Sequence, residues 1–273
     1  MIRHAEGCDW WSQDKSHIAE AVEVDLSSLE LPGVQEELLK EIKKTGKPMI
    51  VVLIAGKPLA MPWVKENADA VLVQWYAGEQ QGCTLADILL GKVNPSGKLN
   101  VSFPRSTGNT PCFYNHFVTD REESFDQPGT PEEPKGHYIF DKPEPLWNFG
   151  HGKSYTTFDY VDCALSDTLL VASDTLKVSV TIKNTGRRDG KEVVQLYVRD
   201  KVSTVATPIQ QLKAFQKVLI KPGESQCVEL SLPIAELALY NAKMEEVVEP
   251  GDFEIQIGAA SDDIRFKKTI TIN

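Results

Sequence analysis

The chain has 273 residues, of which 41% are hydrophobic and 25% are charged. This balance is typical of a folded globular protein and not of a disordered one. Its 29 Lys and Arg residues are outnumbered by 39 Asp and Glu residues, giving a formal net charge of −10. Such an acidic chain has no electrostatic attraction to nucleic acid or to anionic membranes, whereas neutral ligands such as sugars remain compatible with it.

No apolar run is as long as a transmembrane helix, and the first residues lack the hydrophobic segment of a signal peptide. The five cysteines are scattered, odd in number and never spaced as C-x-x-C. This pattern argues against a disulfide scaffold and against a zinc site, so we expect no metal. Free thiols slightly favour a reducing, cytoplasmic location.

Residues 29–103 alternate predicted helices and strands. One helix begins near Gly33, and Val34, Leu38 and Ile42 recur along it at four-residue spacing before Gly46 ends it. A second helix covers Thr84–Leu90, and the predicted strands are the apolar runs Met49–Ile54, Val71–Trp75 and Leu99–Phe103. Strands that alternate with helices indicate a mainly parallel α/β sheet.

Residues 104–157 are rich in proline and show no periodicity, which is typical of a long surface connection. We expect four aromatic residues to pack parts of it, namely Phe113, Tyr114, Tyr138 and Trp147.

From residue 158 onward the apolar period becomes two. Val178, Val180 and Ile182 alternate with polar residues, and similar alternation recurs in three further stretches separated by turn sequences such as Lys221-Pro222-Gly223. Several short alternating strands with regular turns predict an antiparallel all-β sandwich. Its strands form one continuous stretch, so we expect the sandwich to fold alone.

Several stretches closely resemble the C-terminal part of family 3 glycoside hydrolases, which are β-glucosidase-like enzymes. They include SLELPGVQEELLKEIKKTGKPMIVVLIAGKPLAMPW (28–63), ENADAVLVQWYAGEQQG (66–82), LADILLGKVNPSGKLNVSFPRS (85–106) and PLWNFGHGKSYTTFDY (145–160). The tail, with VTIKNTGRRDGKEVVQLYVRD (180–200) and LKAFQKVLIKPGES (212–225), resembles that family's fibronectin type III-like domain.

The resemblance implies an incomplete α/β sandwich domain followed by an all-β fibronectin type III-like or immunoglobulin-like sandwich. We assign residues 1–110 to a partial α/β domain, 111–157 to the irregular connection and 158–273 to the fibronectin type III-like domain. The family's N-terminal barrel domain has no counterpart in the sequence. Since parallel strands of the α/β domain are missing, we expect it to expose unpaired backbone groups and apolar surface.

In the family, the barrel carries the nucleophilic aspartate in a context resembling Ser-Asp-Trp. The only Asp-Trp here is Asp9-Trp10, and Cys8 precedes it. The family's acid/base glutamate lies in a loop between segments resembling SHIAEAVE (16–23) and LPGVQ (31–35), and about two dozen residues of that loop are missing here. Glu23 is the candidate acid/base, although it equally fits the exposed end of a helix that contains Glu20.

Three tryptophans are candidate sugar contacts, because an aromatic face packs against the C–H face of a pyranose. Trp10 and Trp11 are adjacent, and Trp75 ends a predicted parallel strand, where α/β sheets place ligand-binding loops. Ordinary packing is the competing interpretation for all three.

The resemblance implies retaining hydrolysis of a terminal β-linked glucosyl or related residue, with no cofactor. The partners would be a β-linked glucoside or oligosaccharide, held through the missing barrel, and a possible separate barrel-bearing chain. Without the barrel we expect this chain to be inactive. The alternatives are a non-catalytic carbohydrate-binding or interaction module and a decayed, truncated gene product.

Overall fold

The computed structural model describes residues 27–117, 130–132, 142 and 144–273. These residues form two compact units, which are described separately. The first unit contains residues 27–92, 102–112, 130–132, 142 and 144–147, and the second contains 93–101, 113–117 and 148–273. Trp10, Trp11, Glu23 and Tyr138 lie outside the described residues.

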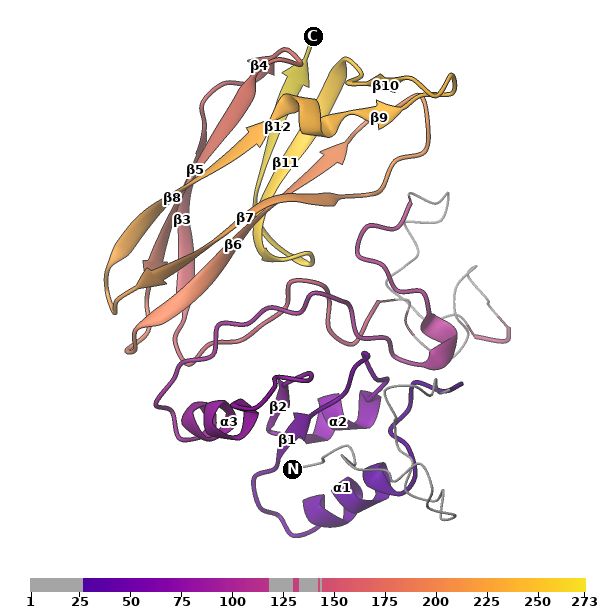
Figure 1. Cartoon of the computed structure of the whole chain (residues 1–273), viewed down its shortest axis with the longest axis vertical. Helices are drawn as coiled ribbons and strands as arrows, with labels where there is room; N and C mark the ends of the chain where they lie inside the picture. The colour runs from indigo at the N-terminus through magenta and orange to yellow at the C-terminus, as the bar shows by residue number, and fades with distance from the viewer. Residues whose placement is uncertain (1–26, 118–129, 133–141, 143) are drawn as a thin grey trace. The chain divides into compact units, whose positions relative to one another are not determined.

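The first unit is built around a parallel strand pair. Strand β1 (Ile50–Leu53) pairs with β2 (Ala70–Val73), and helix α2 (Pro62–Asn67) connects them (Figure 1). Three successive residues of β1, Val51, Val52 and Leu53, are at most 4% exposed. A continuous apolar run suits a strand covered on both faces, and the predicted parallel α/β arrangement is confirmed.

Helix α1 (Gln35–Lys43) turns only part of its apolar surface inward. Leu39 is buried, whereas Val34, Leu38 and Ile42 are 69%, 53% and 41% exposed. These three residues follow the predicted four-residue spacing and so share one helix face. The described part of the chain therefore leaves an apolar stripe on α1.

We expect the chain to bind a dye that fluoresces on exposed apolar surface, and Leu38→Lys to reduce that fluorescence because it places a charge inside the stripe. Glu37→Lys, a change at an exposed polar position of the same helix, is the matched control and should leave the fluorescence unchanged. Absence of dye binding by the unmodified chain would contradict the exposure of the stripe.

The segment Leu99–Phe103 is not a strand of the parallel sheet, so that prediction was wrong. The Phe103 N–H donates to Trp147 O at 2.8 Å, and Leu146 N–H donates to Phe103 O at 2.7 Å, forming an isolated antiparallel bridge. In the second unit, Leu99 N–H donates to His151 O in the same way. The backbone groups that a sheet strand would need are thus used by residues 146–151.

The described aromatic residues of the predicted connection differ in their environment. Tyr114 stacks on Phe149 with ring centroids 4.1 Å apart, and Trp147 packs edge-on against Phe103 at 5.7 Å, as expected of packing residues. Phe113 is 64% exposed, so its predicted packing was wrong.

The second unit is the predicted antiparallel sandwich (Figure 1). One sheet has the order β4-β12-β11-β6-β7 and the other has the order β3-β5-β8. The strands are β3 (Phe158–Leu165), β4 (Leu169–Leu170), β5 (Thr175–Asn184), β6 (Gly190–Asp200), β7 (Gln211–Ile220), β8 (Ser225–Pro233), β11 (Gly251–Ala260) and β12 (Asp263–Ile272). A short hairpin of β9 (Leu239–Tyr240) and β10 (Glu246–Val247) follows the 3₁₀ turn η4 (Ile234–Leu237).

Alternation on β5 is complete and confirms the period-two prediction. Leu176, Val178, Val180 and Ile182 are fully buried between the sheets, while the residues between them are exposed or half-buried. The facing strands supply apolar residues of the same kind, so the interior is one continuous core.

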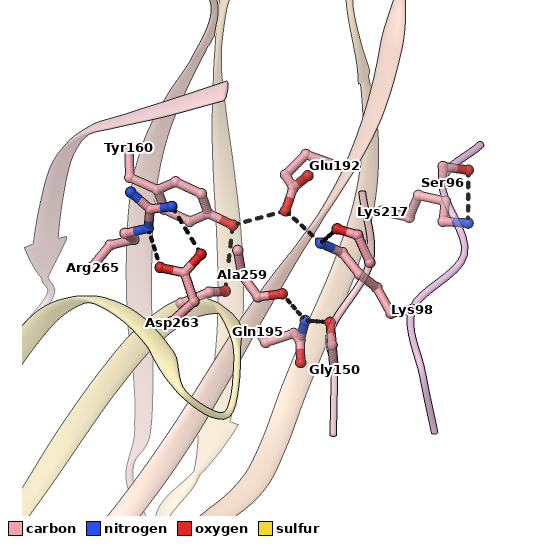
Figure 2. Close-up of polar contacts among 12 residues, drawn as sticks. Ser96, Lys98, Gly150, Tyr160, Glu192, Gln195, Lys217, Ala259, Asp263 and Arg265 are labelled. Atoms are coloured by element: carbon pink, nitrogen blue, oxygen red, sulfur yellow. Dashed lines mark hydrogen bonds and ion pairs between the residues drawn. The ribbon is translucent and has the colours of Figure 1, made fainter. Parts of the chain in front are cut away.

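Strand β6 departs from simple alternation because it is buried on both faces. Val193, Gln195 and Tyr197 point away from the core, yet they are 8%, 3% and 0% exposed. Gln195 Nε2 donates to Gly150 O at 3.3 Å and to Ala259 O at 2.6 Å (Figure 2). The outer face of β6 is therefore covered by chain that precedes residue 158.

A buried ion pair attaches one of the covering segments. Lys98 Nζ lies 3.2 Å from Glu192 Oε1, with side chains 14% and 7% exposed (Figure 2). The Tyr160 hydroxyl lies 3.3 Å from both Glu192 Oε1 and Gly258 O. Burial, and then the neighbouring Glu192 carboxylate, raise the pKa of Tyr160 far above its ordinary value, so it stays a neutral hydrogen-bond donor.

Asn94 fixes the start of the same segment. Its Nδ2 donates to Asp189 O at 2.8 Å, and its Oδ1 accepts from Ser154 Oγ at 2.9 Å and from Tyr155 N–H at 2.8 Å. The NPSGKL motif (94–99) therefore serves here as a structural attachment to the sandwich.

In the described residues, Cys83, Cys112, Cys163 and Cys227 are free thiols. No helix in that part of the chain is long and apolar enough to cross a membrane.

Candidate functional site

The carboxyl ends of β1 and β2 meet at one edge of the first unit. Leu53 pairs with Val73, and Gln74 N–H donates to Leu53 O at 2.9 Å, so the residues that follow both strands lie together. In parallel α/β sheets this edge is where ligands bind, because loops and not strands form its surface. Gln74, Trp75 and Tyr76 occupy it.

Trp75 has an unusual backbone conformation for a bulky residue. Its φ is 51°, in the left-handed region that side chains other than glycine rarely adopt. Conformations of this kind cost about 1–3 kcal/mol and gather at functional sites, where the surrounding structure maintains them. The half-buried ring of Trp75 lies 5.9 Å from that of Phe103, at an interplanar angle of 44°.

Phe103 links Trp75 to a second tryptophan. It is fully buried and makes an edge contact with the half-buried Trp147 at 5.7 Å. Lys65 Nζ lies 5.7 Å from the centre of the Trp147 ring and also donates to Leu146 O. The result is an aromatic cluster in which both tryptophans keep part of their surface accessible.

Gln74 contributes a polar atom without a hydrogen-bond partner in the described part of the chain. Its Nε2 donates to Gln81 O at 2.6 Å, at the first residue of helix α3 (Gln81–Leu89). Its Oε1 is buried and accepts no hydrogen bond from any described residue. A buried acceptor left unsatisfied costs about 1–3 kcal/mol, a cost that one enclosed water molecule would remove.

This edge offers an aromatic ring and a buried amide as candidate binding groups. Asp69 lies at the opposite edge, because it precedes β2. The Met49 N–H, which donates to its carboxylate at 2.7 Å, and then Lys43 lower the pKa of Asp69, so it stays ionised at neutral pH. A general acid needs a raised pKa, so Asp69 is unsuited to that role.

Of the predicted site residues, the structure describes Trp75 alone. It lies at the carboxyl end of its strand, and its role as a sugar contact remains a prediction. Glu23, Trp10 and Trp11 fall outside the described residues. No group of three His, Cys, Asp or Glu side chains within the described ranges could hold a metal ion. Sequence reasoning missed Gln74, although a polar amide that directly follows the apolar run 71–73 is a usable signal.

Comparison with known proteins matches two parts of the chain to family models. Residues 9–155 match the glycosyl hydrolase family 3 C-terminal domain, and residues 192–261 match a fibronectin type III-like domain. The chain is 39% identical to a β-xylosidase of Formosa agariphila over 97% of its own length and 38% of the relative's length. It is 40% identical to a periplasmic β-glucosidase of Salmonella typhimurium over 86% of its length and 30% of the relative's.

Solved structures of β-glucosidases are similar to the described chain as well. A β-glucosidase from Listeria innocua in complex with glucose superposes with a TM-score of 0.82 at 36% identity, covering 91% of this chain and 34% of that one. Fold and site together define an α/β domain followed by a fibronectin type III-like sandwich. The chain belongs to glycosyl hydrolase family 3, and it matches the C-terminal part of β-glucosidases and β-xylosidases over 30–38% of their length.

Proposed function

We propose that this chain is the C-terminal portion of a β-glucosidase-like hydrolase that removes a terminal β-linked glucosyl or related residue with retention. The carrying observation is the match to the family 3 C-terminal domain over residues 9–155. Relatives named β-glucosidase and β-xylosidase support the substrate class. The glucose complex of the Listeria innocua enzyme supports a sugar in the parent active site.

Retaining hydrolysis needs two carboxyl groups about 5–5.5 Å apart, one as the nucleophile and one as the acid/base. The resemblance assigns the nucleophile to a barrel domain, in a Ser-Asp-Trp context that these 273 residues do not contain. We propose that the barrel acts together with this chain, joined to it or as a separate chain. Alone, the 273 residues would hold no nucleophile and would be inactive.

We propose Glu23 as the acid/base, within a shortened loop. The comparison with the Formosa agariphila β-xylosidase extends over 288 positions, and 288 − 273 leaves at least 15 that have no counterpart in this chain. These unmatched positions support a deletion in this chain but do not show where it lies. Trp75, whose ring is half-buried, would contact the sugar from the α/β side.

The test is a fusion in which the barrel of the Listeria innocua β-glucosidase precedes the 273 residues. We expect the fusion to hydrolyse aryl β-glucosides that carry a good leaving group, with the β-anomer as first product by NMR. A good leaving group departs without being protonated, so these substrates test the nucleophile without requiring the acid/base. A folded fusion that hydrolyses no aryl β-glucoside or β-xyloside would contradict the proposal.

The same fusion tests Glu23. A general acid contributes about 10²–10⁴-fold, and chiefly for substrates whose leaving group must be protonated. Glu23→Gln should therefore slow alkyl β-glucosides by about 10²-fold or more and barely affect activated aryl glucosides. Glu20→Gln, at a neighbouring carboxyl, is the control. Equal behaviour of the two variants would assign Glu23 to an exposed helix end.

A further inference from the structure

A pocket of about 210 Å³ opens at one end of the sandwich. Its wall includes Val198, Asp200, Thr207, Gln211, Lys213 and Tyr240, all from the second unit. A cavity of this size admits one small ligand and not an oligosaccharide. Turn η4 and strand β9, seen near the end of β6 in Figure 1, contribute to it.

The pocket forms where the inner face of the sheet changes from apolar to polar. On β6, Val194, Leu196 and Val198 face the core, and the next position of that face is Asp200. Asp200 pairs with the buried Phe253 of β11, and Val198 pairs with Gln211 of β7. Residues paired directly across antiparallel strands share a face, so Asp200 and Gln211 continue the core surface with hydrogen-bonding groups.

These polar groups have unused hydrogen-bonding capacity. The Asp200 carboxylate accepts one bond, from Val202 N–H at 3.2 Å, and has no other hydrogen-bond donor among the described residues. The Thr207 hydroxyl and the Gln211 amide, both half-buried, make no side-chain hydrogen bond in that part of the chain. Lys213 Nζ donates one bond, to Glu236 O at 2.7 Å, and keeps two donors.

Hydrogen bonds anchor the loop around Thr207 that forms one wall of the pocket. Glu249 accepts from Thr204 N–H at 2.9 Å and from Ser203 Oγ at 3.1 Å, which fixes the loop leading to Thr207. On the far side of Thr207, Ile209 N–H donates to His116 O at 2.9 Å. A pocket whose loop is anchored on both sides needs little rearrangement to bind, which favours affinity.

Burial raises the pKa of Asp200 and lowers the pKa of Lys213. Each charged group has therefore lost part of the hydration that stabilises it in water. The two opposite charges balance, so the wall does not select a ligand for net charge. Tyr240, which is 60% exposed, adds an accessible aromatic ring at the rim.

We propose that this pocket binds a single neutral pyranose, with Tyr240 against the C–H face of the ring and Asp200, Thr207 and Gln211 on its hydroxyl groups. A pyranose combines an apolar face with hydroxyls that both donate and accept, which matches this set of groups. The site would let the sandwich hold a sugar independently of the proposed hydrolysis. It is separate from the aromatic cluster of Trp75, Phe103 and Trp147.

The experiment follows amide resonances of the 273-residue chain by ¹H–¹⁵N NMR during titration with methyl β-D-glucopyranoside. We expect saturable shifts confined to the pocket, with a dissociation constant on the order of millimolar. Asp200→Ala and Tyr240→Ala should each weaken binding by about tenfold, since each removes a main contact. Asp159→Ala and Tyr155→Ala, at exposed positions elsewhere on the sandwich, should stay within about twofold.

Tyr240 is exposed, so its replacement leaves folding intact even if Asp200→Ala lowers the unfolding temperature. No shift at tens of millimolar ligand, or shifts confined to Gln74 and Trp75, would overturn the proposal. In the barrel fusion, Asp200→Ala should leave hydrolysis unchanged. An inactive fusion that still shows the pocket shifts would contradict the proposed hydrolase function alone.

Discussion

Lys98→Met should lower the free energy of unfolding of the sandwich unit by about 3 kcal/mol. The change removes the cation that lies 3.2 Å from Glu192 and leaves a carboxylate that is 7% exposed without its partner. Breaking a buried pair on one side costs far more than the pair contributes, because the remaining charge stays desolvated. Urea unfolding followed by the sandwich amide resonances gives the measurement.

Lys217→Met is the matched control. Lys217 also reaches the segment 93–101, where its Nζ donates to Ser96 Oγ at 3.2 Å, but this bond is exposed to water. Exposed contacts of this kind contribute about 0–1 kcal/mol. Adding Glu192→Leu to Lys98→Met should recover much of the lost stability. Equal effects of the two lysine replacements would contradict a buried, structurally required pair.

Residues 158–273 alone should be less stable than the same sandwich in the full chain, by about 3–5 kcal/mol. Their outer β6 face would lose its cover, and Val193 and Tyr197, now 8% and 0% exposed, would meet water. Fully burying one large apolar side chain is worth about 1.5–3 kcal/mol. A chain of residues 93–273 keeps the covering segments and should match the full chain.

Glu192→Gln distinguishes the loss of the segments that cover β6 from a nonspecific destabilisation caused by the truncation. In the full chain it leaves the Lys98 ammonium unpaired and should cost about 3 kcal/mol. In residues 158–273, where Lys98 is absent and Glu192 meets water, it should cost less than about 0.5 kcal/mol. Equal stability of the short and full sandwiches would show that the cover on β6 contributes nothing.

Local sequence patterns predict those strands that are buried by the packing of their own sheet. The apolar runs of β1 and β2 predict a parallel pair, and the alternation of β5 predicts a half-buried antiparallel strand. The alternation of Val194, Leu196 and Val198 predicts strand β6 as well. The burial of its outer face could not be predicted, because segments far away in the sequence cover it. Leu99–Phe103 has a strand-like composition, but its hydrogen bonds go to residues 146–151.

The candidate sites show the same limit. The sequence predicts that Trp75 ends a parallel strand, whereas its contact with Phe103 and the free acceptor of Gln74 exist only once the chain is folded. The sandwich pocket had a usable signal in the alternation of Val194, Leu196 and Val198, which continues to a carboxylate at Asp200. Its volume depends on η4 and β9, which no local pattern places there.

The central claim is that these 273 residues supply the part of a family 3 hydrolase that does not carry the nucleophile. The most direct test is the rate at which the purified chain alone releases nitrophenol from 4-nitrophenyl β-D-glucopyranoside. We predict the uncatalysed rate, unchanged by Glu23→Gln. Turnover that co-purifies with the chain and disappears in Glu23→Gln or Asp9→Asn would contradict the account.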